Sequence, residues 1–211
     1  MTRIAAASAL LTLACLATPG FAAAPAAPTA WVADPAKSTL EFSFVQAGAK
    51  TSGRFARFTT NVDLDPAKLA AARIDVSIDI ASVDTKDKDR DTTLKTPELF
   101  DPAKFPRATY VATQVTAKGT GFEGRGKLTL RGVAADVPIA FTFTPGTEAG
   151  APVATMKGTA TIKRLTFGVG QGEWKSTEWV SDDVQVSFNL RLVPRAAAPQ
   201  VPTAPAPATK R

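Results

Sequence analysis

Apolar and polar residues alternate with a period of two along much of this chain. In residues 74–80 isoleucine and valine occupy one face, and aspartate and serine occupy the other. The same alternation recurs in three further segments, 40–44, 137–143 and 184–192. This period is typical of strands with one buried face and one face in water. Less regular patterns predict further strands at 51–64, 108–116, 123–131 and 154–164.

Strands with one apolar face each have to enclose a common core, and either a two-sheet sandwich or a closed barrel does this. Periodicity does not distinguish the two. It does not by itself exclude an outer-membrane barrel either, but Asp75, Asp79 and Arg191 on the polar faces would be costly against lipid. A barrel with its apolar face inward is therefore favoured. Such a barrel is filled by its own side chains or holds one small ligand, and the pattern alone favours filling.

Residues 90–110 interrupt the alternation. The stretch starts with charged residues, contains three prolines, and is followed by a return to the strand pattern. We expect it to form a short helical cap over the barrel, with Asp84 or Thr85 capping the helix. A short helical turn is also expected at 65–69, and a hairpin turn at 132–136. The apolar residues expected to gate the cap are Leu94, Leu99, Phe100 and Phe105.

The acidic residues at the start of this stretch imitate a calcium-binding loop. Asp87, Asp89 and Asp91 have the spacing of an EF-hand, with Glu98 at position twelve. Position six requires glycine for a sharp turn, and Thr92 stands there. A solvated helix start is therefore the better interpretation, and no metal site is predicted.

The two ends of the chain differ from the rest. Residues 1–22 contain Arg3, an apolar run too short to span a bilayer, and small residues at the end, which predicts a signal peptide and export. Alternatively, a lipoprotein-like box would make Cys15 a lipid anchor, although Thr12 stands where such boxes have leucine. An Ala/Pro-rich linker at 23–30 and a disordered Pro/Ala-rich tail at 194–211 leave 31–193 as the folded domain.

Removal of the signal peptide would leave neither cysteine nor histidine. This excludes a thiol nucleophile, a histidine general base and a Cys/His metal site, so no catalytic residue is assigned. The formal net charge of +6 fits a soluble basic protein or one that attracts anionic headgroups. No nucleic-acid motif is present, and none is expected behind a signal peptide.

Four sequence blocks, in order along the chain, resemble the YceI family. They are SVDT at 82–85, RDTTL at 90–94 running into FDPAKFP at 100–106, GKLTLRGV at 126–133, and RLTFG at 164–168. Thr93 stands where the family usually has histidine. The resemblance implies an eight-stranded antiparallel, lipocalin-like barrel that binds a long apolar lipid in the periplasm. The implied ligand is a polyisoprenoid, such as an isoprenoid quinone or an isoprenyl phosphate, with no further cofactor.

This resemblance favours an open lumen, and strand patterning then indicates which residues line it. The lumen candidates are Phe42, Phe44, Phe58, Ile78, Tyr110, Leu130, Phe141, Phe167 and Phe188. Three arginines could fork onto an anionic headgroup or pair with a nearby aspartate (Asp84, Asp91 or Asp101) instead: Arg54, Arg90 and Arg164. Trp174 and Trp179 are expected to fold onto the barrel rim.

Two other functions remain open at this point. A hydrolase acting on lipid or sugar could use paired carboxylates, for example Glu173 and Glu178. A packed barrel could instead serve as an interaction module beside a membrane redox protein. The sequence does not distinguish a monomer from a homodimer.

Overall fold

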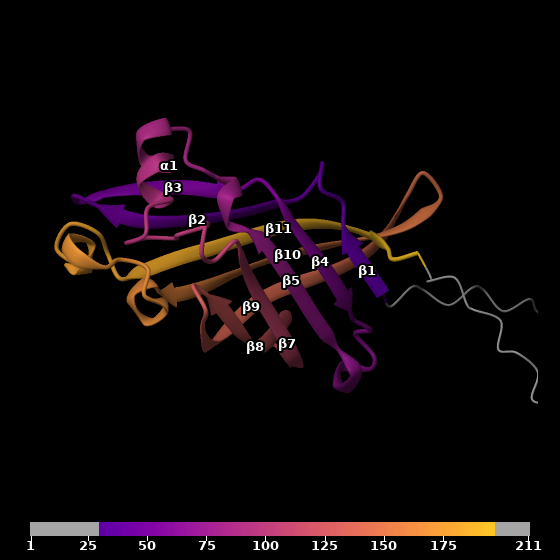
Figure 1. Ribbon diagram of the computed structural model, residues 1–211. Helices are drawn as coiled ribbons and strands as arrows, with labels where there is room; N and C mark the ends of the chain where they lie inside the picture. The colour runs from indigo at the N-terminus through magenta and orange to yellow at the C-terminus, as the bar shows by residue number, and fades with distance from the viewer. Residues whose placement is uncertain (1–29, 197–211) are drawn as a thin grey trace, which may run out of the picture.

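The computed structural model describes residues 30–196. The predicted signal peptide, the Cys15 lipoprotein alternative and nearly all of the linker and tail lie outside this range. The described residues form eleven strands and one α-helix, α1 (Lys88–Leu94) (Figure 1). The strands are β1 (Ala30–Ala33), β2 (Thr39–Gln46), β3 (Ala49–Phe55), β4 (Phe58–Asp63), β5 (Arg73–Asp79), β6 (Val83–Asp84), β7 (Arg107–Lys118), β8 (Gly121–Leu130), β9 (Val133–Glu148), β10 (Ala151–Lys163) and β11 (Asp183–Pro194). No helix within 30–196 has the length and apolar character needed to cross a membrane.

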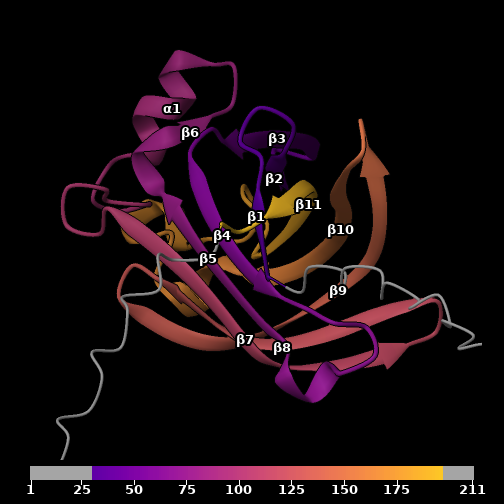
Figure 2. The ribbon, with the colours of Figure 1, turned by 90° about the vertical axis from the view of Figure 1, so that its right-hand side faces the viewer.

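Eight of the strands close into an antiparallel barrel, which confirms the predicted fold class. Their order around the ring is β1-β4-β5-β7-β8-β9-β10-β11, and the ring closes because β1 pairs with both β4 and β11. Figure 2 shows this ring from the β1 side. Across the closing seam Val32 lies opposite Val193, and Ala33 lies opposite Leu192. Closure leaves no free edge in this part of the sheet.

A second branch starts from β11. The first half of β11 pairs with β2, and β2 continues the sheet through β3 to β6. The strand predicted over 51–64 is therefore two strands with different neighbours, and this expectation was wrong. The chain turns between them because the backbone N–H groups of Ala56 and Arg57 donate to the carbonyl and the hydroxyl of Ser82, each at 3.0 Å.

The predicted turn at 132–136 is shorter than expected. Only Arg131 and Gly132 separate β8 from β9, with φ angles of 50° and 75°. Two successive positive φ angles are typical of a type I′ hairpin, in which glycine at the second position is unstrained. The expected helical turn at 65–69 begins later, as a 3₁₀ turn at Leu69–Ala71.

The interior is filled at one end and open at the other. At the β1 end the Trp31 ring packs edge-on against Phe143, with 5.9 Å between ring centres. Val62 and Leu192 beside it are fully enclosed. The prediction that side chains fill the lumen therefore holds for this end alone. The other end, beneath α1, contains the cavity described below.

Helix α1 begins two or three residues later than expected. Its N-cap is Asp87, not Asp84 or Thr85, because the Asp87 carboxylate accepts hydrogen bonds from the backbone N–H groups of Asp89 and Arg90, at 3.1 and 3.0 Å. Thr85 is instead held by Asp91, whose carboxylate accepts from its N–H and hydroxyl at 2.8 and 2.6 Å. These bonds attach the start of the cap helix to the barrel wall.

Truncation of the seam should weaken the whole barrel. Leu192→Ala removes a fully buried side chain from β11 where it meets β1, and such a cavity costs about 2–5 kcal/mol of unfolding free energy. Urea unfolding should show this loss. Ser187→Ala on the exposed face of the same strand is the control and should stay within about 0.5 kcal/mol of the parent. Equal effects of the two substitutions would contradict the role of the seam.

Candidate functional site

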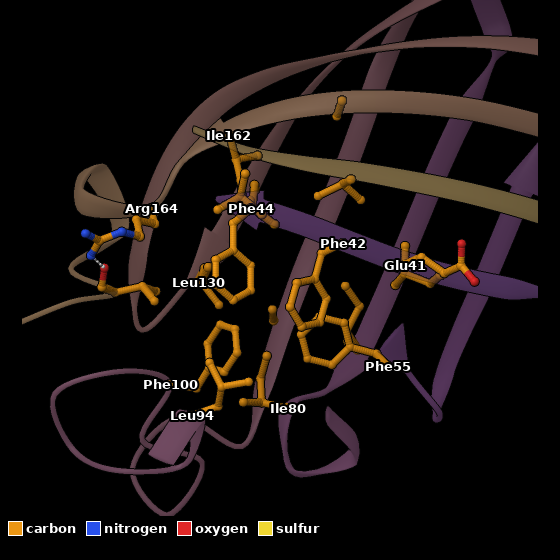
Figure 3. Close-up of a pocket in the computed structure, with 18 of the residues that line it drawn as sticks. Glu41, Phe42, Phe44, Phe55, Ile80, Leu94, Phe100, Leu130, Ile162 and Arg164 are labelled. Carbon is orange, nitrogen blue, oxygen red and sulfur yellow. Dashed lines mark hydrogen bonds between the residues drawn. The ribbon is translucent and has the colours of Figure 1, made fainter. Parts of the chain in front are cut away.

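A cavity of about 480 Å³ occupies the open end of the barrel (Figure 3). Its walls come from the inward faces of most of the strands, and its cover comes from α1 and residues 99–100. The lining is predominantly aliphatic and aromatic. Four polar side chains of the lining lie at the cap helix, Asp87, Asp89, Arg90 and Thr93, and four others come from the rest of the wall: Glu41, Gln46, Thr60 and Arg164. The cavity therefore has an apolar body with a polar group of residues at one side.

Seven of the nine predicted lumen residues line this cavity. They are Phe42, Phe44, Phe58, Ile78, Tyr110, Leu130 and Phe188. Their strands are far apart in the sequence, but alternate residues of each point inward. Tyr110 carries the one hydroxyl of this group, which donates to the carbonyl of Val137 at 3.0 Å. Burial raises the pKa of this phenol far above its usual value, so the group stays neutral.

Phe141 and Phe167 were predicted as lumen residues, but they are not among the residues that line this cavity. Phe141 lies further along β9, toward the filled end, where its ring stacks on Phe122 with 5.5 Å between centres. Phe167 is buried, but it belongs to a 3₁₀ turn, Arg164–Phe167, that follows β10. Strand alternation does not extend into that turn.

Several residues that line the cavity were not among the lumen residues predicted from the sequence. Most lie on the predicted strand faces, which alternation marks as inward without showing how far along the barrel each residue lies. Phe55 had a weaker signal, because the irregular pattern around Gly53 concealed the strand. The missed apolar residues include Leu40, Phe55, Ile74, Val76, Ile80, Leu128, Val137, Ile139, Met156, Ile162, Val184, Val186 and Leu190.

The cap contributes three of its four predicted residues to the cavity. Leu94, Leu99 and Phe100 line it, and Leu94 and Phe100 point inward in Figure 3. Phe105 does not, which corrects its assignment. Its ring packs against Gly132 at the β8–β9 turn, with the cations of Lys104 and Arg131 lying 5.3 and 5.4 Å from its centre.

The cap is tied to two other parts of the barrel. The Arg131 guanidinium donates to the carbonyl of Pro97 at 2.8 Å and also to that of Leu99. The backbone N–H groups of Gly170 and Gln171 donate to the Glu98 carbonyl, each at 2.9 Å. These bonds hold the segment that places Leu99 over the cavity.

Arg164 is almost fully buried, and all five of its N–H donors are used. Nε donates to the Ser181 carbonyl at 3.0 Å, and the two terminal nitrogens donate to four more carbonyls at 2.7–3.1 Å. Those four carbonyls belong to Val169, Trp174, Ser176 and Val180. Burial lowers the pKa of Arg164, and Asp182 partly opposes this shift. With no donor free for a headgroup, Arg164 holds the loop that carries three lining residues, Val169, Trp174 and Val180.

The other two arginines are paired with aspartates. Arg54 lies outside the cavity lining and forms an ion pair with Asp84 at 2.8 Å. The Lys86 backbone N–H and this guanidinium lower the pKa of the Asp84 carboxyl. Arg90 does line the cavity, and its guanidinium lies 3.4 Å from Asp87. Of the three predicted headgroup candidates, only Arg90 combines access to the cavity with a partner that it can exchange.

The two tryptophans face in different directions. Trp174 lines the cavity. Trp179 is not among the lining residues, and it is 69% exposed. The next residue, Val180, forms an isolated β-bridge with Gln46 and lines the cavity.

Two aspartates on the strand faces, Asp75 and Asp79, form ion pairs. Asp75 pairs with Arg73 at 2.7 Å and Asp79 with Arg57 at 2.8 Å on the barrel exterior. Within residues 30–196, no three acidic, histidine or cysteine side chains gather as a metal site would require. The EF-hand-like aspartates Asp87 and Asp91 instead cap a helix and bind Thr85.

The family follows from comparison with known proteins. The model of the YceI-like domain matches residues 31–192. The chain belongs to this family. A UPF0312 protein of Shewanella denitrificans is 30% identical over 165 residues, 74% of each chain. A UPF0312 protein of Vibrio cholerae is 32% identical over 120 residues, which cover 56% of this chain and 64% of that relative.

Solved structures show the same fold. BcnA of Burkholderia cenocepacia is 37% identical, with a TM-score of 0.70 over 75% of this chain and 98% of BcnA. A polyisoprenoid binding domain from Saccharophagus degradans is 16% identical, with a TM-score of 0.58 over 80% of this chain and 99% of that domain. At this low identity, the second likeness concerns the fold alone.

Substitution of the buried arginine should loosen the loop. Arg164→Lys leaves three donors for five carbonyls, and an unsatisfied buried group costs about 1–3 kcal/mol. We expect lower stability in urea and faster hydrogen exchange over residues 169–180. Arg125→Lys, on an exposed strand face, is the matched control. Unchanged exchange in Arg164→Lys would contradict the assigned role.

The cap helix should respond to acid. Its N–H donors, above all that of Arg90, lower the pKa of Asp87 below the ordinary value of 3.8. This stabilisation is complete above 3.8 and is lost as the pH falls through the lowered pKa. The amide proton shifts of Asp89 and Arg90 should therefore titrate in NMR spectra below that pH. Asp87→Asn should abolish the step, and its persistence with the same midpoint would show that another group causes it.

Proposed function

We propose that this protein is an exported, periplasmic carrier that holds one long apolar lipid of the polyisoprenoid class in its barrel and performs no reaction on it. The observation that carries this proposal is the cavity itself. It measures about 480 Å³, has an apolar body, and lies beneath a cap that also presents apolar residues. Such a space fits a hydrocarbon chain rather than a polar metabolite.

Affinity would come from burial of the chain. Each Å² of apolar surface removed from water contributes about 25 cal/mol, and each buried CH₂ group about 0.8 kcal/mol. The Tyr110 hydroxyl already donates to a carbonyl, so it does not need a water molecule in the cavity as a partner. A long uniform chain thus gains more from this cavity than a short or polar ligand.

Orientation would come from the polar side chains of α1. Arg90, Asp87, Asp89 and Thr93 border the cavity, so the headgroup would lie beside them and the tail would point into the barrel. Arg90 could exchange its aspartate partner for a phosphate, whereas a quinone would leave that ion pair intact. Both isoprenoid quinones and isoprenyl phosphates therefore belong to the proposed ligand class.

Two further observations support the proposal. The solved domain from Saccharophagus degradans, which has the same barrel fold, is described as polyisoprenoid binding. Residues 1–22 have the composition of a signal peptide, which supports export of the chain. A lipid carrier in the periplasm would shield an apolar chain from water between membranes.

Native mass spectrometry of the purified protein, followed by organic extraction, tests this function. We expect a bound prenyl lipid, or uptake of added prenyl lipid by the ligand-free protein. Ala160→Trp, which places a large ring in the cavity wall, should abolish uptake. Ala140→Trp on the exposed face of β9 is the matched control and should bind normally. Protein that carries no lipid and takes none up would refute the proposal.

A further inference from the structure

Phe42, one of the lining rings, lies directly over a glycine of the next strand. Phe42 on β2 and Gly53 on β3 are register partners. A Cβ atom added at Gly53 would lie 2.6 Å from Cζ and 3.0 Å from Cε1 of Phe42, and 2.8 Å from Cγ2 of Thr85. These distances are too short for carbon atoms in contact. The ring therefore occupies the space that any other residue at position 53 would need.

If the Phe42 ring is displaced, it moves toward the cavity. Phe42 stands between Phe44, almost parallel at 6.3 Å, and Phe55, tilted at 5.3 Å between ring centres. Phe55 in turn meets Phe100 of the cap edge-on at 5.8 Å. Figure 3 shows these four rings grouped against the cavity, and all four line it. With rings on both sides and β3 behind it, Phe42 has free space only in the lumen.

At Gly53 the arrangement can be altered by moving side chains alone, namely the Phe42 ring and the Thr85 methyl group. All three near atoms are side-chain atoms, and Gly53 does not have a positive φ angle, so alanine fits its backbone. Tyr110 over Gly126 and Phe188 over Gly158 repeat the pattern, with 2.5 and 2.4 Å to the ring Cζ atoms. At those two glycines, however, a Cβ would also lie within 2.7 Å of a backbone oxygen.

We propose that Gly53 determines the length of apolar chain that the barrel accepts, because it lets Phe42 lie flat against β3 and keeps that part of the lumen open. The proposal rests on the proposed lipid-binding function. A side chain at position 53 pushes Phe42 into the lumen and shortens the space. Long chains then lose more affinity than short ones, since a short chain does not need the blocked part.

The test compares two linear prenyl alcohols, farnesol and the much longer solanesol, in titrations of the full protein. Gly53→Ala should weaken solanesol binding by about tenfold or more and change farnesol binding by less than about twofold. Gly53→Ala combined with Phe42→Leu, which removes the ring, should restore solanesol binding. Gly146→Ala is the matched control on β9, because a Cβ there meets only a Val153 methyl carbon at 3.9 Å.

The outcomes separate the two proposals. If the parent protein binds neither alcohol, the lipid-binding function fails, and the role of Gly53 fails with it. If the parent binds solanesol and Gly53→Ala binds it equally well, or the double variant shows no recovery, only the role of Gly53 is overturned. Should Gly53→Ala not fold, Phe42→Leu alone decides: the preference for solanesol over farnesol has to rise, and an unchanged preference overturns the proposal.

Discussion

The pairing of β1 with β11 is the constraint on which the rest of this structure depends. A sheet with one apolar face has to close or be covered, and here a four-residue strand completes the ring between β4 and β11. The seam contains Trp31 and Leu192, which are also part of the filled end of the barrel. One end is thus stabilised by packing, and the other can remain open.

The open end is held mainly by bonds to backbone carbonyls rather than by a packed core. Arg164 satisfies five carbonyls of one loop, and Arg131 satisfies two of the cap. Arginine suits this task, because its planar fork directs several donors at once. Arg164 had been a candidate for binding a headgroup, yet in the fold both arginines position the walls of the site. Hydrogen bonds of this kind hold the cover of the lumen in place and leave the lumen itself apolar.

Most of the predicted lumen residues line the cavity, and the properties of strand alternation explain both these residues and the exceptions. Alternation shows which side of a strand a residue faces, so Phe42, Ile78 and Tyr110 were assigned to the interior correctly. Alternation does not show how far along the barrel axis a residue lies. It therefore could not show that Phe141 lies beyond the cavity. It also does not hold in turns, and Phe167 belongs to the 3₁₀ turn that follows β10. The close approach of Phe42 to Gly53 has no sequence signal, because strand register creates it.

The sequence by itself determined the all-β class, the family and the inward faces of the strands, since these follow from local periodicity and contiguous motifs. Only the tertiary structure decided that 51–64 divides into two strands, that the arginines Arg54 and Arg164 are occupied, and that an apolar cavity remains. These features depend on which strands become neighbours and on how far apart opposite walls lie. Such distances arise from closure of the ring, and no segment of the chain specifies them alone.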